Sequence, residues 1–229
     1  CCGEKAYQVT GAGYAPQGEF VRDGEQVKAL KETDLVSILT AGLLCNNAIL
    51  RENDGVYEML GDPTEGALVV SALKAGLVRE PQRLDELPFE SRLQYMATLH
   101  DCGDGHARMA YMKGSVEAII PRCVWELGNS GEKKPADAQA IDQRTKAMAS
   151  NGLRVLAFAG KEMPAATTAT FLARMKPLSA ELPHSTYMPF SKNARQYPPN
   201  PVAGVMSSAS RLPAKSPIGA IPQGLPAGE

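Results

Sequence analysis

The sequence predicts an α+β fold in which an antiparallel sheet is flanked by helices. Segments whose apolar residues recur about every 3.6 residues alternate with β-rich runs. Two such runs, at 95–100 and 107–112, are separated by Asp-Cys-Gly-Asp-Gly at 101–105, which is typical of a tight hairpin. Because a hairpin joins antiparallel strands, and because helices and strands are mixed along the chain, we expect α+β.

The first half of the chain contains two predicted helices. A short strand at 6–9 leads into a Gly-rich turn at 11–18, and apolar periodicity then predicts a helix from Glu32 to Asn46. A strand at 56–60 precedes the second helix, which is amphipathic and begins in Gly-Asp-Pro-Thr-Glu-Gly-Ala-Leu at 61–68.

The segment after the hairpin supplies the remaining elements. Short helices are predicted at 115–122 and 137–150, and Gly152 suits the C-terminal cap of the second one. The apolar run from Leu153 to Ala159 predicts a buried strand.

The composition is that of an ordinary globular chain and excludes several classes of protein. Of the 229 residues 44% are hydrophobic, and the net charge of -1 provides no global field for nucleic acid or an anionic membrane. No run of about 18 apolar residues occurs, so we expect no membrane-spanning helix. The five cysteines have neither a C-x-x-C pair nor metal-ligand spacing to the three histidines, which predicts reduced thiols in a cytoplasmic setting and no metal site.

The composition changes near residue 165. Residues 166–229 carry six Lys/Arg, two acids and ten of the 17 prolines. With few regularly spaced large apolar residues, such a segment buries too little surface to offset its chain entropy. We therefore expect a folded domain over 1–165 and a largely irregular, basic, Pro-rich tail over 166–229.

A first group of candidate residues lies at 62–65. Asp62, Pro63 and Glu65 have the spacing of a helix cap, a first helical residue and the third residue of a capping box. Capping is the simpler interpretation on local grounds. A carboxylate at a helix start can also accept a hydrogen bond from the exocyclic amine of a ligand.

Three further residues have one structural and one functional interpretation each. Phe89 is either a core aromatic or a face on which a flat ring stacks. Lys113, followed by Gly114 at a strand-to-helix junction, is either a solvated lysine or part of an anion site. Arg154, at the head of a buried strand, is either half of an ion pair or a cation for a ligand.

The order and spacing of four motifs resemble the nucleotide-binding domain of P-type cation-transporting ATPases. The resemblance is to type II pumps of the calcium and sodium/potassium kind, in bacterial form, and it covers about residues 6–163. The motifs are Gly-Asp-Pro-Thr-Glu-Gly-Ala-Leu at 61–68, Leu-Pro-Phe-Glu-Ser with Tyr-Met-Ala-Thr-Leu-His at 87–100, Lys-Gly-Ser-Val-Glu-Ala-Ile-Ile-Pro-Arg-Cys at 113–123 and Gly-Leu-Arg-Val-Leu-Ala-Phe-Ala at 152–159.

The resemblance implies a role for each residue of an ATP site. Phe89 would stack on adenine, Glu65 would accept from the adenine amine, and Arg154 would reach the phosphates. Asp62 would cap its helix, with a secondary role at the site. The remaining pocket residues implied by the resemblance are Ser91, Gln94, Met96, Lys113, Gly114 and Ser115. Gln94 stands where several animal pumps have Lys, which should weaken the attraction to phosphate.

The resemblance also implies what this chain lacks. The phosphorylated Asp of Asp-Lys-Thr-Gly-Thr does not occur in the sequence, nor does the metal-binding Asp motif of the phosphorylation domain. We therefore expect no catalytic residue and no metal site here, and a fragment that binds ATP without hydrolysing it. Its partners would be the phosphorylation and actuator domains of the parent pump, with Mg²⁺ arriving with ATP and held mainly by the phosphorylation domain. The chain would be a soluble cytoplasmic domain of an integral membrane pump, without membrane or nucleic-acid contact of its own.

Alternative interpretations remain open at this stage. A self-contained kinase or phosphatase would need a metal-binding carboxylate pair or an activated nucleophile, and neither pattern is present. A non-catalytic interaction module with a vestigial nucleotide pocket is the main alternative, and failure to fold because of truncation is another. The tail lacks the Asp-Pro-Pro-Arg expected after 170–172, so we interpret it as frame-shifted or spliced in, or else as a basic linker that contacts acidic lipids or partners.

Overall fold

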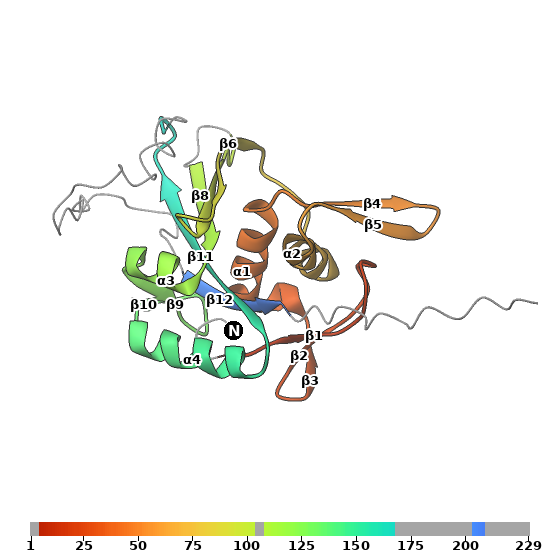
Figure 1. The fold of residues 1–229 in the computed structure, drawn as a ribbon, viewed down its shortest axis with the longest axis horizontal. Coiled ribbons are helices and arrows are strands. Elements are labelled where there is room, and N and C mark those ends of the chain that lie inside the picture. The colour runs from red at the N-terminus through yellow and green to blue at the C-terminus, as the bar shows by residue number, and fades with distance from the viewer. Residues whose placement is uncertain (1–4, 104–107, 168–202, 209–229) are drawn as a thin grey trace, which may run out of the picture.

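A seven-stranded sheet forms the centre of the molecule (Figure 1). The computed structural model describes residues 5–103, 108–167 and, for the backbone alone, 203–208. The strands of the sheet are β6 (Arg83–Glu90), β7 (Tyr95–His100), β8 (Arg108–Gly114), β9 (Trp125–Leu127), β10 (Lys133–Pro135), β11 (Arg154–Met163) and β12 (Ala203–Ser208). Their spatial order is β10-β9-β12-β11-β8-β7-β6, and every neighbouring pair is antiparallel except β12 and β9. The predicted antiparallel α+β fold is confirmed.

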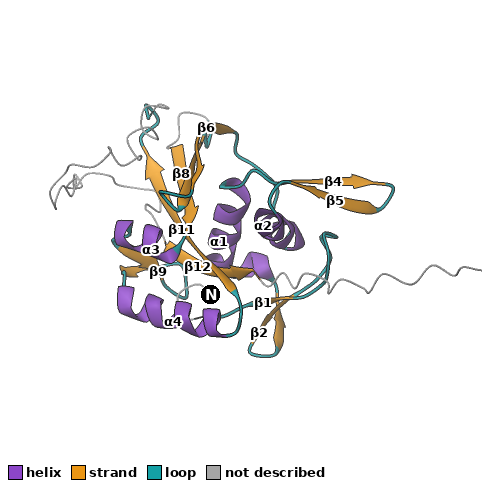
Figure 2. Cartoon of the chain, viewed as in Figure 1, coloured by secondary structure: helices purple, strands orange, loops and turns teal. Residues whose placement is uncertain are grey.

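Helices cover both faces of this sheet, and Figure 2 shows them as two separate groups. One group is α1 (Thr33–Leu44), preceded by η1 (Ala29–Lys31), with α2 (Pro63–Lys74); the other is α3 (Val116–Ile119), η2 (Ile120–Arg122) and α4 (Ala138–Ser150). Phe158 packs with α1 and α2, whereas its neighbour Ala157 belongs to the cluster that includes Ile119 and Ile141. Because successive strand residues face opposite sides, the two helix groups lie on opposite faces.

Two small sheets complete the fold. The first consists of β1 (Gln8–Val9), β2 (Phe20–Arg22) and β3 (Glu25–Val27), and Phe20 of this sheet is buried against α1 and α2. The second is the hairpin of β4 (Ile49–Asn53) and β5 (Val56–Leu60), which projects from the body of the molecule (Figure 1).

Several predicted elements lie where the pattern placed them. The strands at 56–60 and 95–100 are confirmed, and Gly152 ends α4 with a φ of 72°. The first predicted helix ends at Leu44 rather than Asn46, and this difference matters for the site below. Strand β6 was not predicted because Pro88 interrupts its pattern, and β9 and β10 were missed because each has only three residues.

Six residues of the tail take part in the central sheet. Strand β12 pairs with β11 from Arg154↔Ser208 to Ala159↔Ala203. The rest of the tail beyond residue 167 lies outside the described residues, as do the last two residues of the turn predicted at 101–105. Among the residues that the structure describes, no helix combines the length and the apolar character needed to span a bilayer.

Candidate functional site

The start of α2 has the predicted cap and one unexpected contact. The Asp62 carboxylate accepts hydrogen bonds from the N–H groups of Thr64 (2.8 Å) and Glu65 (3.2 Å), with Pro63 as the first helical residue. Glu65 does not complete a capping box by reaching back to Asp62. Its Oε2 instead accepts from the N–H of Asn47 at 2.8 Å, so the carboxylate is turned toward the segment that follows α1.

The second Glu65 oxygen pairs with Lys113. Lys113 Nζ donates to Glu65 Oε1 at 2.9 Å, and Lys113 is only 5% exposed, which excludes the solvated lysine. An ionised carboxylate has about four acceptor positions. Asn47 and Lys113 occupy one on each oxygen, and the Glu65 side chain is still 18% exposed. A surface-facing acceptor therefore remains for a donor from a ligand.

Phe89 lies on a bulge in β6. Leu87 pairs with Ala97 and Glu90 with Tyr95, so Pro88 and Phe89 both stand opposite Met96 alone. A bulge of this kind changes the direction in which a strand side chain points. Phe89 is 58% exposed, which rules out the core aromatic and leaves its ring available on the surface.

Met96 links this bulge to the lysine. Met96 is paired with Lys113 across β7 and β8, and Lys113 is paired in turn with Phe158 of β11. The side chain of Met96 is 1% exposed, so it lies beneath the surface between Phe89 and Lys113 rather than on it.

Gln94 and Ser115 are hydrogen-bonded to each other, next to Phe89, Met96 and Lys113 on the three neighbouring strands. Gln94 lies in the turn after β6 with a φ of 58°, and its carbonyl accepts from the Ser115 N–H at 2.9 Å. Ser115 Oγ donates to Gln94 Oε1 at 3.2 Å and also caps α3 by accepting from the Ala118 N–H. Ser91 is exposed in the same turn.

The Gly114 position has a structural explanation. A Cβ built there would overlap the Gln94 carbonyl oxygen and come 2.6 Å from the Tyr95 Cβ. The glycine is therefore required by the close approach of β7, independently of any ligand.

Arg154, the first residue of β11, contacts the start of α2. Its Nη1 is 3.3 Å from Thr64 Oγ1, and its side chain is exposed. Partial burial raises the pKa of the Asp62 carboxyl, but the amides of Glu65 and Thr64 and the charge of Arg154 more than offset this, so the pKa lies below its ordinary value. Arg154 is thus a surface cation close to Asp62, and the exposed guanidinium remains available to an anionic group.

The structure therefore brings the sequence-predicted residues together from four separate segments. Phe89, Glu65 and Arg154 are accessible, whereas Met96, Lys113 and Gly114 support them from below. Sequence reasoning missed Asn46 and Asn47, which follow α1 and contact Glu65. The sequence feature that could have indicated them is the pair of adjacent asparagines just after the apolar residues of α1.

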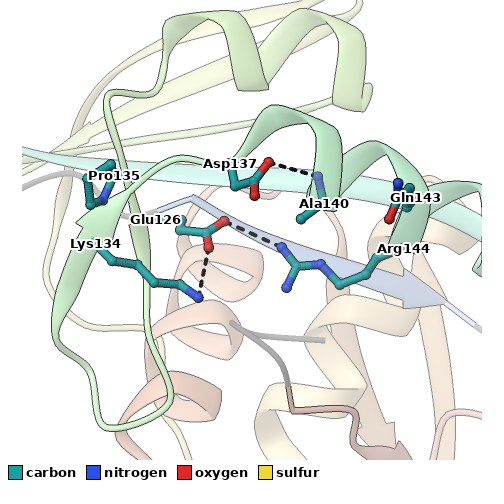
Figure 3. Close-up of a pocket in the computed structure, with 7 residues that line it drawn as sticks. All are labelled: Glu126, Lys134, Pro135, Asp137, Ala140, Gln143 and Arg144. Atoms are coloured by element: carbon teal, nitrogen blue, oxygen red, sulfur yellow. Dashed lines mark hydrogen bonds and ion pairs between the residues drawn. The ribbon is translucent and has the colours of Figure 1, made fainter.

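A pocket of about 410 Å³ lies elsewhere, between the β9–β10 hairpin and the start of α4 (Figure 3). Glu126 is nearly buried in it and pairs with Lys134 (3.1 Å) and Arg144 (3.4 Å), while Asp137 caps α4. Strands β9 and β10 are at the opposite end of the sheet from β6, so this pocket is separate from the Phe89 surface. The charges of Lys134 and Arg144 are compensated there by Glu126.

Comparison with known proteins identifies the class to which this fold and site belong. A sequence model of the P-type ATPase cytoplasmic domain N matches residues 34–192, and the chain belongs to this family. The matched range contains all four motifs on which the resemblance is based, which lie between residues 61 and 159.

The similar proteins include bacterial and animal pumps. The chain is 46% identical over 169 residues to "Cation-transporting ATPase pma1" of Synechocystis, covering 69% of this chain and 18% of that protein. It is 39% identical over 158 residues to "Probable cation-transporting ATPase F" of Mycobacterium tuberculosis (66% and 17%). With "Calcium-transporting ATPase type 2C member 1" of Bos taurus the identity is 38% over 160 residues (66% and 16%). The chain thus spans less than a fifth of the length of these relatives.

Proposed function

We propose that this domain binds ATP through its adenine ring, as the nucleotide-binding domain of a cation-transporting P-type ATPase. The observation that carries the proposal is the exposed Phe89 ring on β6, two strands away from the Lys113 that holds the Glu65 carboxylate. An exposed aromatic ring and a fixed acceptor at the same end of the sheet match a flat base with an exocyclic amine. Names of the relatives describe cation and calcium transport, which agrees with this role.

Phe89 and Glu65 would recognise different features of the base. Phe89 would stack on the ring face, an interaction that contributes about 1–3 kcal/mol per base. Glu65 would accept from the adenine 6-amino group. Guanine has a carbonyl oxygen at that position, which a carboxylate repels, so the same residue disfavours GTP.

The phosphate end of the nucleotide would lie toward Arg154. Phe158 is the strand partner of Lys113, and Arg154 is four residues earlier on β11, roughly 13 Å along the strand. Arg154 would bias the triphosphate toward the start of α2. Lys113 would act on the base side, because its ammonium is paired with Glu65.

Phosphoryl transfer would depend on parts of the pump outside this chain. The domain would present the γ-phosphate to an Asp of the phosphorylation domain, whose motif the sequence does not contain. Within the described residues, no three His, Cys, Asp or Glu side chains gather as a metal site. The Mg²⁺ that accompanies ATP would therefore contact the phosphates and the phosphorylation domain, while residues here bind and orient the nucleotide.

Calorimetric titration tests this proposal. ATP and GTP are titrated into the chain and into Phe89→Ala, with Trp125→Ala as a matched control, because Trp125 is a partly exposed aromatic on β9 of the same sheet. We expect ATP to bind more tightly than GTP, and Phe89→Ala to weaken ATP binding by about five- to a hundred-fold. Trp125→Ala should leave it unchanged. If the folded chain binds no ATP, the interaction module with a vestigial pocket becomes the better description.

A further inference from the structure

Asn46 is a buried side chain that connects α1 to the start of α2. It is fully buried and lies two residues after the last residue of α1. Its Nδ2 donates to the carbonyl of Gly42 in α1 and to the carbonyl of Glu65 in α2, each at 2.9 Å. Its Oδ1 accepts from the N–H of Ala48 at 2.8 Å. The amide group therefore makes three hydrogen bonds that fix the chain direction after α1 relative to Glu65.

The peptide that joins Asn46 to Asn47 is held on both of its sides. On one side, the Asn46 carbonyl accepts from the guanidinium groups of Arg79 and Arg83. On the other side, the Asn47 N–H donates to Glu65 Oε2. In a planar trans peptide the C=O and N–H groups point in opposite directions. Anchoring the carbonyl on the arginines therefore aims the N–H at Glu65.

The same arginines also fix the flanking residues. Arg83 Nη2 donates to the Leu44 carbonyl at 3.1 Å, and Arg79 Nη2 donates to the Ala48 carbonyl at 2.9 Å. The segment 44–48 consequently has little freedom to turn its amide away from Glu65. Without that amide the Glu65 carboxylate would keep the Lys113 ammonium as its one hydrogen-bond partner among the described residues, and the side chain could rotate about a single contact.

We infer that Asn46 is a positioning residue that orients the Glu65 carboxylate for adenine recognition. The inference rests on the proposed function, since it concerns the same site. Lys113 holds one carboxylate oxygen and the Asn47 N–H holds the other, so the plane of the carboxylate is fixed and its remaining acceptor positions face a constant direction. A directional acceptor is what distinguishes an amine donor on adenine from the carbonyl of guanine.

An amide at position 46 is the residue type that these three contacts require. Asp would place an oxygen against the Gly42 and Glu65 carbonyls. An apolar residue would leave the Gly42 carbonyl and the Ala48 N–H buried without these bonds, and the Glu65 carbonyl would keep only its bond within α2. Ser is too short to reach both helices. The requirement arises from the backbone groups of Gly42, Ala48 and Glu65 and not from the ligand.

The test uses Asn46→Ala with Asn151→Ala as the matched control. Asn151 also follows a helix and donates its Nδ2 to the carbonyl four residues earlier, Ala147, at 3.0 Å, but it is exposed at the end of α4. Both variants therefore lose the same type of bond to the carbonyl of a preceding helix. Arg83→Gln is a second variant, at a side chain that is partly exposed. It loosens the same peptide from its carbonyl side and also removes the bond from Arg83 Nη1 to Asn47 Oδ1.

Two readouts are measured for each folded variant. The first is the amide proton resonance of Asn47 without nucleotide, assigned by its displacement in Glu65→Gln, because a proton donated to a carboxylate resonates at lower field. The second is the ratio of the dissociation constants for GTP and ATP. We expect Asn46→Ala to move the Asn47 resonance upfield and to lower the ratio by about three- to tenfold. Arg83→Gln should have a smaller effect in the same direction, and Asn151→Ala none.

The outcomes separate this inference from the proposed function. An unchanged Asn47 resonance in folded Asn46→Ala and Arg83→Gln would overturn the positioning role, whatever ATP does. A displaced resonance with an unchanged GTP-to-ATP ratio would overturn the link to base recognition. If the wild-type chain binds neither nucleotide while the resonance moves, the proposed function and the link to adenine both fail, but the geometric role of Asn46 stands.

Discussion

The ammonium of Lys113 and the carboxylate of Glu65 lie 2.9 Å apart and join strand β8 of the central sheet to the first turn of α2. Lys113 is nearly buried, and taking its charge out of water costs free energy that the pair only partly returns. Such a pair is therefore weak evidence for stability. Its consequence is geometric, because Glu65 is held toward β8 instead of capping its own helix.

Breaking this pair should destabilise the domain. Lys113→Met keeps the volume of the side chain but leaves the Glu65 carboxylate without its cation. We expect a loss of about 1–3 kcal/mol in the free energy of unfolding, below the range for fully buried pairs because Glu65 retains 18% exposure. Chemical denaturation followed by circular dichroism measures it.

A double-mutant cycle provides the control for this prediction. Adding Glu65→Gln to Lys113→Met removes the uncompensated charge, so part of the lost stability should return. If the two substitutions are strictly additive, the 2.9 Å contact carries no coupling energy and the pair is not formed in solution.

The candidate site was predictable where local sequence determines it. The role of Asp62 as a helix cap follows from Asp-Pro-Thr-Glu, because its carboxylate accepts from N–H groups no more than three residues away in the sequence. The exposure of Phe89 was not predictable, because it depends on a bulge whose register is set by pairing with β7. The pairing of Lys113 with Glu65 joins residues 48 positions apart, and no periodicity within either segment specifies it.

The same distinction explains the parts of the fold that were missed. Strands of five or more residues with continuous β-rich sequence, such as β5 and β7, can be recognised locally. Strand β12 carries no such signal within a Pro-rich segment, and it exists in this sheet only through pairing with β11 and β9. The apolar periodicity predicted that the first helix ends at Asn46. In the structure the helix ends at Leu44, and the Asn46 side chain bonds to Glu65 and Ala48 outside it.

The cap at Asp62 should make stability depend on pH. Asp62→Ala should cost about 1 kcal/mol near neutral pH, the usual value for an N-cap. The pKa of Asp62 is lower in the folded chain than the ordinary value, which is about 3.9. The folded state therefore binds fewer protons than the unfolded state, so the stabilisation is complete above about pH 4 and is lost as the pH falls through the folded pKa.

Asp62→Asn separates the charge from the cap in this experiment. Asn caps helices about as well as Asp but does not titrate there. The stability difference between wild type and Asp62→Asn should shrink as the pH is lowered below about 4, measured by urea denaturation at several pH values. A difference that stays constant down to pH 2 would contradict the assignment of the lowered pKa to Asp62.

The N-terminal sheet should belong to the folded domain, although the family match begins only at residue 34. Phe20 of β2 is 3% exposed and packs with Leu39 and Leu68. Glu32 also holds this segment, because its carboxylate accepts from Lys5 and Arg22. We expect Phe20→Ala to lower the free energy of unfolding by about 3 kcal/mol or more, as for other buried Phe side chains.

Val9→Ala is the matched comparison for Phe20. Val9 lies on the neighbouring strand β1 and is paired with Phe20 in register, but it is exposed. Its substitution should change the stability by less than about 0.5 kcal/mol. Equal and small effects of the two substitutions would place residues 5–27 outside the cooperative unit and move the start of the domain toward residue 28.

Gln94→Lys should strengthen the attraction to a triphosphate. Gln94 is exposed in the turn beside Phe89, so a lysine there would extend into solvent near the proposed site. A single exposed cation near phosphate contributes about 0.3–1 kcal/mol, which corresponds to a roughly two- to fivefold lower dissociation constant for ATP. The gain should fall as salt is raised, because the interaction is screened, and adenosine, which has no phosphate, should not show it.

Gln94→Met identifies which property of the side chain matters. Both substitutions remove the acceptor for Ser115 Oγ, but only lysine adds a charge. If the hydrogen bond to Ser115 organises the site, both variants should bind ATP more weakly than wild type. If charge dominates, Lys should bind more tightly and Met about as well as wild type, measured by calorimetry at low and high salt. Tighter binding of adenosine as well as ATP by Gln94→Lys would show that this turn contacts the base and not the phosphates.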